Sequence, residues 1–88
     1  MKFCEFIRKR RREFELTQKE MADYLNISRA TYNQFEKGKV GLDYKEFVKL
    51  LNKLAISYQE AVEIITEEEE MKELQNASVI DTLKYLDK

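Results

Sequence analysis

The segment LNISRATYNQFEKG, residues 25–38, carries the signals for the end of one helix and for the start and end of a second. Asn26 tolerates a positive φ and therefore suits a tight turn after the first helix. Ser28 is a favoured N-cap residue, and Gly38 is a favoured left-handed residue after a helix. Only Asn26 and Ile27 are available to turn the chain, so the two helices are expected to cross steeply.

Similar start signals occur on both sides of this segment. Capping boxes, in which a hydroxyl and a carboxylate three residues later bind each other's backbone amides, begin at Thr17, Ser57 and Thr66. Asp43 and Ser78 begin looser versions. Together with the apolar periodicity, these signals predict helices over about 3–14, 17–25, 28–37, 43–54 and 57–65, followed by an amphipathic stretch over 78–86.

The composition favours helices and a single core. The 88 residues contain no Pro and two Gly, and strong helix formers occur throughout. We therefore expect an all-α protein, large enough for one modest core. Arg10 falls inside the apolar stripe of the first helix, where it must reach solvent or pair with a carboxylate. The expected core residues on the inner helix faces are Phe3, Ile7, Phe14, Met21, Ala22, Leu25, Tyr32, Phe35, Phe47, Leu50, Leu51 and Leu54.

The net charge of −1 conceals opposite charges in the two parts of the chain. Residues 1–53 hold 13 Lys and Arg against 8 Asp and Glu, a net charge of +5, whereas residues 54–88 hold 3 against 9, a net charge of −6. A polyanion therefore suits the N-terminal part. The basic run at 8–12 is expected to be mainly a solvated face with one or two phosphate contacts. The acidic run at 67–70 is expected to be favourable charge in the first turn of a helix.

Residues that carry catalytic chemistry are scarce. The chain has no His and a single Cys, Cys4, which can form no disulfide within the chain and has no imidazole to activate it. No apolar run approaches the roughly 20 residues of a membrane span, and no signal peptide is evident. We expect a cytoplasmic protein that is not an enzyme, needs no metal or cofactor and contacts no membrane.

Three strings of residues carry a resemblance to a known family. LTQKEMA at 16–22, LNISRAT at 25–31 and FEKGK at 35–39 resemble the helix-turn-helix domains of the Cro and phage-repressor (XRE-like) type. The resemblance covers about residues 3–65 and implies a five-helix lambda-repressor-like domain that binds double-stranded DNA. We place this DNA-binding domain at 1–66 and a short acidic, helical C-terminal extension at 67–88.

The resemblance also assigns roles to the matching positions. The residues that would read bases are Arg29, Ala30, Asn33 and Gln34. The residues that would bind phosphates are Thr17, Gln18, Thr31, Lys37 and Lys39. Arg11 and Glu36 match a structural ion pair. Arg can donate two hydrogen bonds to guanine, and Asn or Gln can pair with adenine, so Arg29 and Gln34 rank first as readers. The chain departs from the family pattern at Glu15 and Asn26, where Gly is usual, and at Tyr32, where an aliphatic residue is usual.

Two functions remain open at this point. One is a sequence-specific transcriptional regulator, a repressor, that binds a palindromic operator as a homodimer with half-sites about 34 Å apart. The other is an antitoxin or antirepressor-like interaction module whose C-terminal segment binds a partner protein, such as a toxin or another regulator. Val79, Leu83 and Leu86 would form an apolar face that serves as a dimer seam or partner face, or that covers the domain itself.

Overall fold

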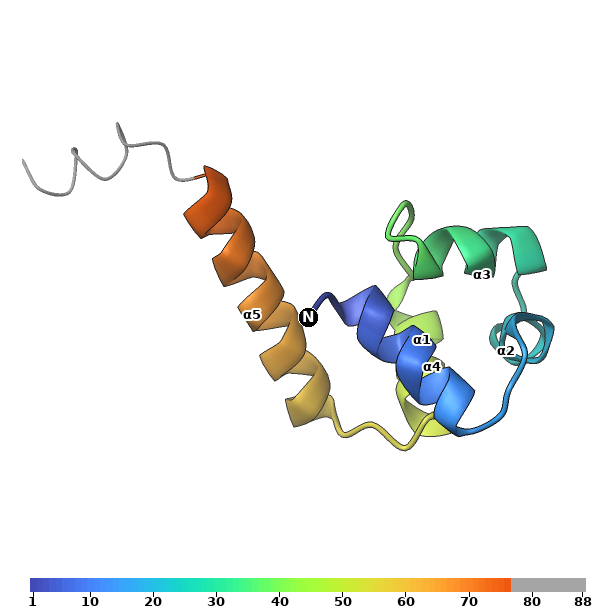
Figure 1. The fold of residues 1–88 in the computed structure, drawn as a ribbon. Helices are drawn as coiled ribbons and strands as arrows, with labels where there is room; N and C mark the ends of the chain where they lie inside the picture. The colour runs from blue at the N-terminus through green and yellow to red at the C-terminus, as the bar shows by residue number, and fades with distance from the viewer. Residues whose placement is uncertain (77–88) are drawn as a thin grey trace, which may run out of the picture.

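The computed structural model describes the backbone of residues 1–76 and the side chains of residues 1–70. This part of the chain forms five helices and no strand, which confirms the predicted all-α, five-helix fold. The helices are α1 (Phe3–Glu13), α2 (Gln18–Leu25), α3 (Arg29–Glu36), α4 (Tyr44–Lys53) and α5 (Tyr58–Asn76). Helices α1 to α4 gather into one body, and α5 runs beside α1 and continues beyond it (Figure 1). The predicted stretch at 78–86, with Val79, Leu83 and Leu86, lies outside the described residues.

Helices α1 to α4 all end in the same way. A residue with positive φ follows each one: Glu15 at 56°, Asn26 at 58°, Gly38 at 78° and Ala55 at 53°. In each case the amide of the next residue donates to a carbonyl five residues before it, as Ile27 does to Ala22 at 3.0 Å. This Schellman arrangement satisfies carbonyls that the helix end would leave free. The positive φ predicted for Asn26 and for Gly38 at these helix ends is confirmed.

Helices α2 to α5 begin at the predicted capping residues, whereas α1 begins after Lys2 without a side-chain cap. Thr17 and Asp43 form complete capping boxes, and the hydroxyl of Ser28 accepts from the amide three residues later. At Ser57 only half of the predicted box is present in the described part of the chain: the hydroxyl accepts from the Glu60 amide, whereas Glu60 Oε1 accepts from Arg10. The predicted helix start at Thr66 is wrong, because α5 runs through this position to Asn76. Inside a continuous helix the amides already have carbonyl partners one turn earlier, so a capping box has nothing to satisfy. The acidic run at 67–70 therefore lies within α5, and the division of the chain at residue 66 stays a prediction.

Residues on the inner faces of all five helices form the hydrophobic core. Phe14 was expected to join it, but its side chain is 43% exposed because it follows the last residue of α1, where the chain turns away. Phe47 is only partly buried against the core. The buried apolar residues are Phe3, Phe6, Ile7, Met21, Ala22, Leu25, Tyr32, Phe35, Leu50, Leu51, Leu54, Ile56 and Ala61.

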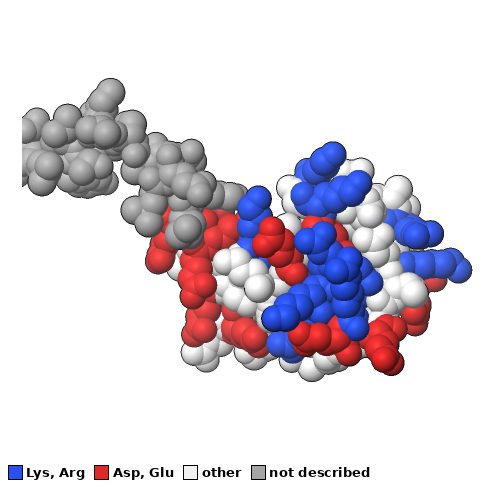
Figure 2. All heavy atoms as spheres, in the orientation of Figure 1, with Lys and Arg blue, Asp and Glu red and all other residues white. Residues whose placement is uncertain are grey.

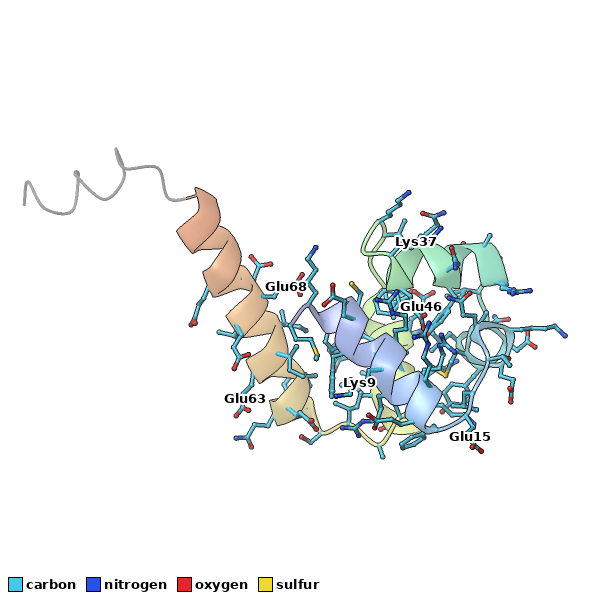
Figure 3. All side chains as sticks on the ribbon, in the orientation of Figure 1. Lys9, Glu15, Lys37, Glu46, Glu63 and Glu68 are labelled. Carbon is cyan, nitrogen blue, oxygen red and sulfur yellow. The ribbon has the colours of Figure 1, made fainter. Side chains whose placement is uncertain are left out.

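Two glutamates of α5, Glu60 and Glu68, make polar contacts that fix this helix against α1. Arg10 donates to the carbonyl of Leu54 at 3.3 Å and to Glu60 Oε1 at 3.5 Å, so pairing with a carboxylate, one of the two alternatives expected for this residue, is present. At the other end of α1, the Phe3 amide donates to Glu68 Oε2 at 3.1 Å, and Figure 3 shows Glu68 beside this helix start. None of the helices in the described part of the chain is long and apolar enough to cross a membrane.

Candidate nucleic-acid interface

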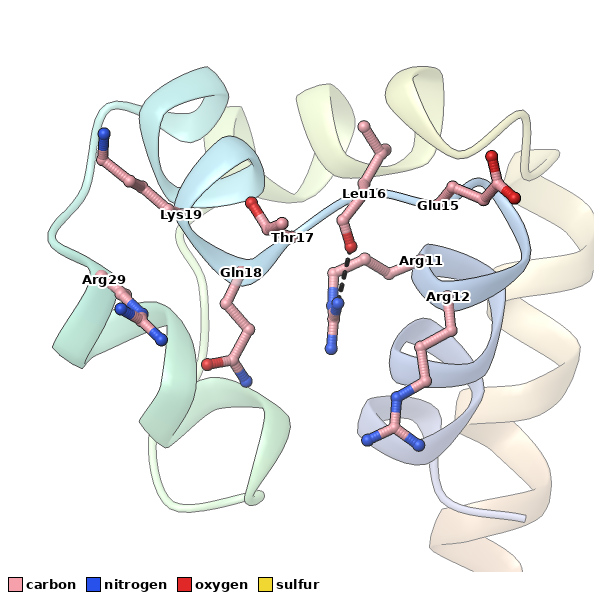
Figure 4. Close-up of a pocket in the computed structure, with 8 residues that line it drawn as sticks. All are labelled: Arg11, Arg12, Glu15, Leu16, Thr17, Gln18, Lys19 and Arg29. Carbon is pink, nitrogen blue, oxygen red and sulfur yellow. Dashed lines mark hydrogen bonds between the residues drawn. The ribbon is translucent and has the colours of Figure 1, made fainter.

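An ion pair between Arg11 and Glu36 joins the end of α1 to the end of α3. Arg11 Nε lies 2.7 Å from Glu36 Oε2, and Nη2 lies 3.1 Å from Oε1. A third guanidinium nitrogen donates to the carbonyl of Leu16 at 2.7 Å, as Figure 4 shows. Both residues are buried, with 7% and 3% of their surfaces exposed. The sequence-based pairing of these two residues is therefore what the structure contains, and it fixes α3 against α1 and the turn before α2.

The surroundings of this pair keep both residues charged. Burial raises the pKa of Glu36, but the hydrogen bonds that it accepts, first from Arg11, outweigh burial and lower the pKa below its usual value. The hydrogen bond to Glu36 raises the pKa of Arg11. Tyr32 lies fully buried nearby on α3, and burial raises the pKa of its hydroxyl. The neighbouring Glu36 carboxylate also raises this pKa, but Oη forms no well-aligned hydrogen bond in the part of the chain that the structure describes.

Two amide side chains continue the hydrogen-bonded chain from this pair toward the surface. Gln18 Nε2, at the start of α2, donates to Glu36 Oε1 at 3.1 Å. Asn33 Nδ2, in the middle of α3, donates to Gln18 Oε1 at 3.0 Å. From the sequence, Gln18 was expected to bind a phosphate and Asn33 to read a base, and the hydrogen bond between them was not expected. No local signal could have shown this, because the two residues are 15 positions apart and meet only through the packing of α2 on α3.

The expected base-reading residues lie together around one surface hollow. Arg29 and Ala30 are exposed at the start of α3, and Asn33 and Gln34 are half-buried one turn later. These side chains and Gln18 line the hollow. The helix therefore presents a cation, a methyl group and two amides on a single face, which suits the edges of bases in a major groove.

A second hollow adjoins the first and carries positive charge. Its lining includes Arg12 at the end of α1, Lys19 at the start of α2 and Arg29, which it shares with the first hollow. Glu15 is the acidic residue of this lining (Figure 4). The remaining residues of the lining are Arg11, Leu16, Thr17 and Gln18. Arg12 was not among the expected phosphate-binding residues, although the basic run at 8–12 was a signal for one or two contacts.

The other expected phosphate-binding residues stand apart from these hollows. Thr31 is exposed, and both its amide and its hydroxyl bind Ser28, the N-cap of α3. Lys37 and Lys39 are exposed in the turn that follows α3, where Figure 3 shows Lys37. In the space-filling view, Lys and Arg side chains gather over α1 and around α3, whereas Asp and Glu cover the face of α5 (Figure 2). The polar face of α3 adjoins the basic hollow, because Gln18 and Arg29 line both hollows.

Three features together define a recognisable arrangement. They are a short turn between α2 and α3, an outward polar face on α3, and the buried Arg11–Glu36 pair behind that face. The family model described as helix-turn-helix matches residues 7–60 of the chain. The chain belongs to the helix-turn-helix family. The match includes both hollows and the Arg11–Glu36 pair, so the candidate interface lies within the part shared with this family.

One relative with a curated description adds to this assignment. The chain is 40% identical over 55 residues to YqaE of Bacillus subtilis strain 168, which is described as an uncharacterized HTH-type transcriptional regulator. The alignment covers 62% of this chain and 47% of that protein, so the chain matches about half the length of this helix-turn-helix relative. No solved structure gives a significant match to the chain.

Proposed function

We propose that the protein is a sequence-specific DNA-binding regulator of transcription that acts by binding alone. The observation that carries this proposal is the hollow on α3, where Arg29, Asn33 and Gln34 lie beside the basic hollow at the start of α2. Membership of the helix-turn-helix family and the description of its relative as a transcriptional regulator support it. In this proposal α3 enters the major groove, and phosphates lie along Lys19 and Arg12.

The finer parts of the proposal concern symmetry and regulation. Because a single eight-residue helix reads few base pairs, two copies acting on a palindromic operator would supply a longer site. The α3 helices of such a homodimer would lie about 34 Å apart, one turn of DNA. Occupation of a promoter by this dimer would make the protein a repressor.

The alternative function, an antitoxin or antirepressor-like module, depends on the C-terminal segment. Its expected partner face of Val79, Leu83 and Leu86 lies outside the described residues, so no contact of the described part bears on a toxin or regulator partner. DNA binding is therefore the function that the described geometry supports best.

A selection of binding sites from random duplex DNA tests the proposal. We expect a preferred site with two symmetric halves, one helical turn between their centres. If a dimer neutralises roughly 6 to 10 phosphates, its affinity should fall about 10³- to 10⁵-fold between about 50 and 200 mM salt. Equal binding to selected and random duplex at near-physiological salt would overturn the proposal.

A further inference from the structure

The side chains of Gln18 and Asn33 lie between a buried carboxylate and the surface hollow on α3. We propose that Glu36, acting through Gln18, fixes which atoms of Asn33 face the DNA, so that Gln18 and Glu36 are positioning residues for base recognition. This inference rests on the proposed function. It gives Gln18 a role in sequence preference in addition to any contact with phosphate.

The carboxylate of Glu36 is paired with Arg11 and therefore only accepts hydrogen bonds. The oxygen and nitrogen of a glutamine amide have nearly the same shape, so chemistry decides which one faces a given partner. Beside the Glu36 carboxylate, the atom of Gln18 must be Nε2, at 3.1 Å. A reversed Gln18 amide would place two acceptors against each other in a half-buried site, which is costly.

The orientation of Gln18 then determines that of Asn33. With Nε2 on Glu36, the oxygen Oε1 of Gln18 faces α3 and accepts from Asn33 at 3.0 Å. The Asn33 atom in this bond must be Nδ2, the donor, so Oδ1 is directed away from Gln18. Two hydrogen bonds in series thus pass the acceptor character of a buried carboxylate to a side chain at the surface.

The atoms that remain free on Asn33 define what it can read. One N–H of Nδ2 is used by Gln18, which leaves the second N–H and Oδ1. This donor and acceptor match N7 and the N6 amino group of adenine in the major groove. Asn33 lines the same hollow as Arg29, the leading candidate for guanine, so the two residues would read neighbouring base pairs. We infer that adenine is preferred at the position that Asn33 contacts.

The test compares base preferences at each position for the full chain and three variants. Gln18→Met removes both ends of the amide and leaves a side chain of similar length. Asn33 then becomes free to rotate, and the preference for adenine at its position, about 5- to 150-fold for a good two-bond contact, should disappear. Asn33→Ala identifies that position and should lose the same preference. The matched control is Lys19→Met, an exposed neighbour on α2, which should weaken all sequences alike.

The outcomes separate this inference from the proposed function. If the unaltered protein selects no sequence, the proposed function fails. If it selects a site and Gln18→Met weakens binding equally at all sequences with the adenine preference intact, the positioning role fails while the proposed function stands. Loss of the preference in Gln18→Met, with the preferences at other positions unchanged, supports the positioning role.

A measurement on the unaltered protein keeps the inference testable if a variant does not fold. One side-chain amide proton of Gln18 and one of Asn33 should exchange with solvent more slowly than those of Asn52, whose side chain belongs to an exposed residue of α4. Equal exchange for the three side chains, followed by nuclear magnetic resonance, would overturn it.

Discussion

Arg11 and Glu36 are 25 residues apart in sequence, yet two hydrogen bonds join their buried charges. Removing two such charges from water costs several kcal/mol per ion, and the pair recovers much of this only while both partners are present. Separating the two residues would leave a buried charge without its partner. The cost of this separation is the main reason why the pair holds α3 in place. This makes the orientation of the candidate reading helix dependent on α1, which lies behind it.

Loss of both partners should cost much less stability than the two single losses added together. Arg11→Met should lower the free energy of unfolding by about 3–5 kcal/mol, because Glu36 is left buried without its cation. The double variant Arg11→Met, Glu36→Met should be less destabilised than the sum of the two single variants. Urea unfolding followed by circular dichroism measures all three. Arg12→Met, an exposed neighbour, should change stability by no more than about 0.5 kcal/mol, and an additive double variant would contradict the prediction.

Acid should weaken the fold through the same pair. The pKa of Glu36 is lower in the folded protein than its ordinary value of 4.5, so its contribution to stability is present above that value. The contribution is lost as the pH falls from there through the folded pKa. We expect the stability difference between the unaltered protein and Glu36→Gln to shrink below about pH 4.5. A difference in thermal midpoint that stays constant over this acid range would contradict the prediction.

Glu15 occupies a backbone conformation that suits Gly and brings a negative charge to the basic hollow. Its φ is 56°, a left-handed conformation that costs a residue with a Cβ about 1–2 kcal/mol. Glu15→Gly should therefore raise the free energy of unfolding by about 1 kcal/mol and also strengthen binding to any DNA. Glu15→Gln is the matched control, since it should strengthen binding without the gain in stability. Equal thermal midpoints for the two variants would argue against backbone strain.

The elements of the fold that were predicted correctly depend on interactions within a few residues. Thr17 and Asp43 begin helices because their capping partners lie three positions later, and Asn26 ends one because its own backbone tolerates positive φ. Thr66 carries the same local signal but lies inside α5. The signal fails there because no break in the helix leaves amides to cap. Local rules of this kind indicate which cap a residue can form. Whether a helix begins at that residue depends on how the rest of the chain packs.

The sequence indicated which residues form the candidate site, but not the hydrogen bonds between them. The resemblance placed Arg29, Asn33 and Gln34 on one face, and they line one hollow. The bond between Gln18 and Asn33 was missed because it forms only when α2 and α3 cross, and family roles had assigned both side chains to DNA. Contacts of this kind join residues distant in sequence, so single-residue reasoning cannot supply them.

Tyr32 places a buried hydroxyl close to the Glu36 carboxylate without a well-aligned hydrogen bond in the described part of the chain. Its ring is fully buried. Tyr32→Phe removes this hydroxyl and keeps the ring, so stability should be unchanged or raised by about 1 kcal/mol. Tyr32→Leu, which restores the family's aliphatic type, should destabilise the fold because it leaves a cavity. A loss of more than about 1 kcal/mol in Tyr32→Phe would show that Oη has a partner in solution.

Two cations lie at opposite ends of α3. If Arg29 reads a base and Lys37 binds a phosphate, replacing each of them should weaken DNA binding in a different way. Arg29 begins the helix and lines both hollows, whereas Lys37 follows its last residue and is exposed. Arg29→Ala should cost about 1–3 kcal/mol of binding on the preferred site and relax the preference at one base pair, because two hydrogen bonds to guanine are lost. Lys37→Ala should weaken all sequences alike and reduce the salt dependence, because it removes one phosphate contact. Binding curves on the selected site and on variants changed at each base pair distinguish the two. An equal loss on every sequence for Arg29→Ala would assign Arg29 to the phosphates and leave base reading to Asn33 and Gln34.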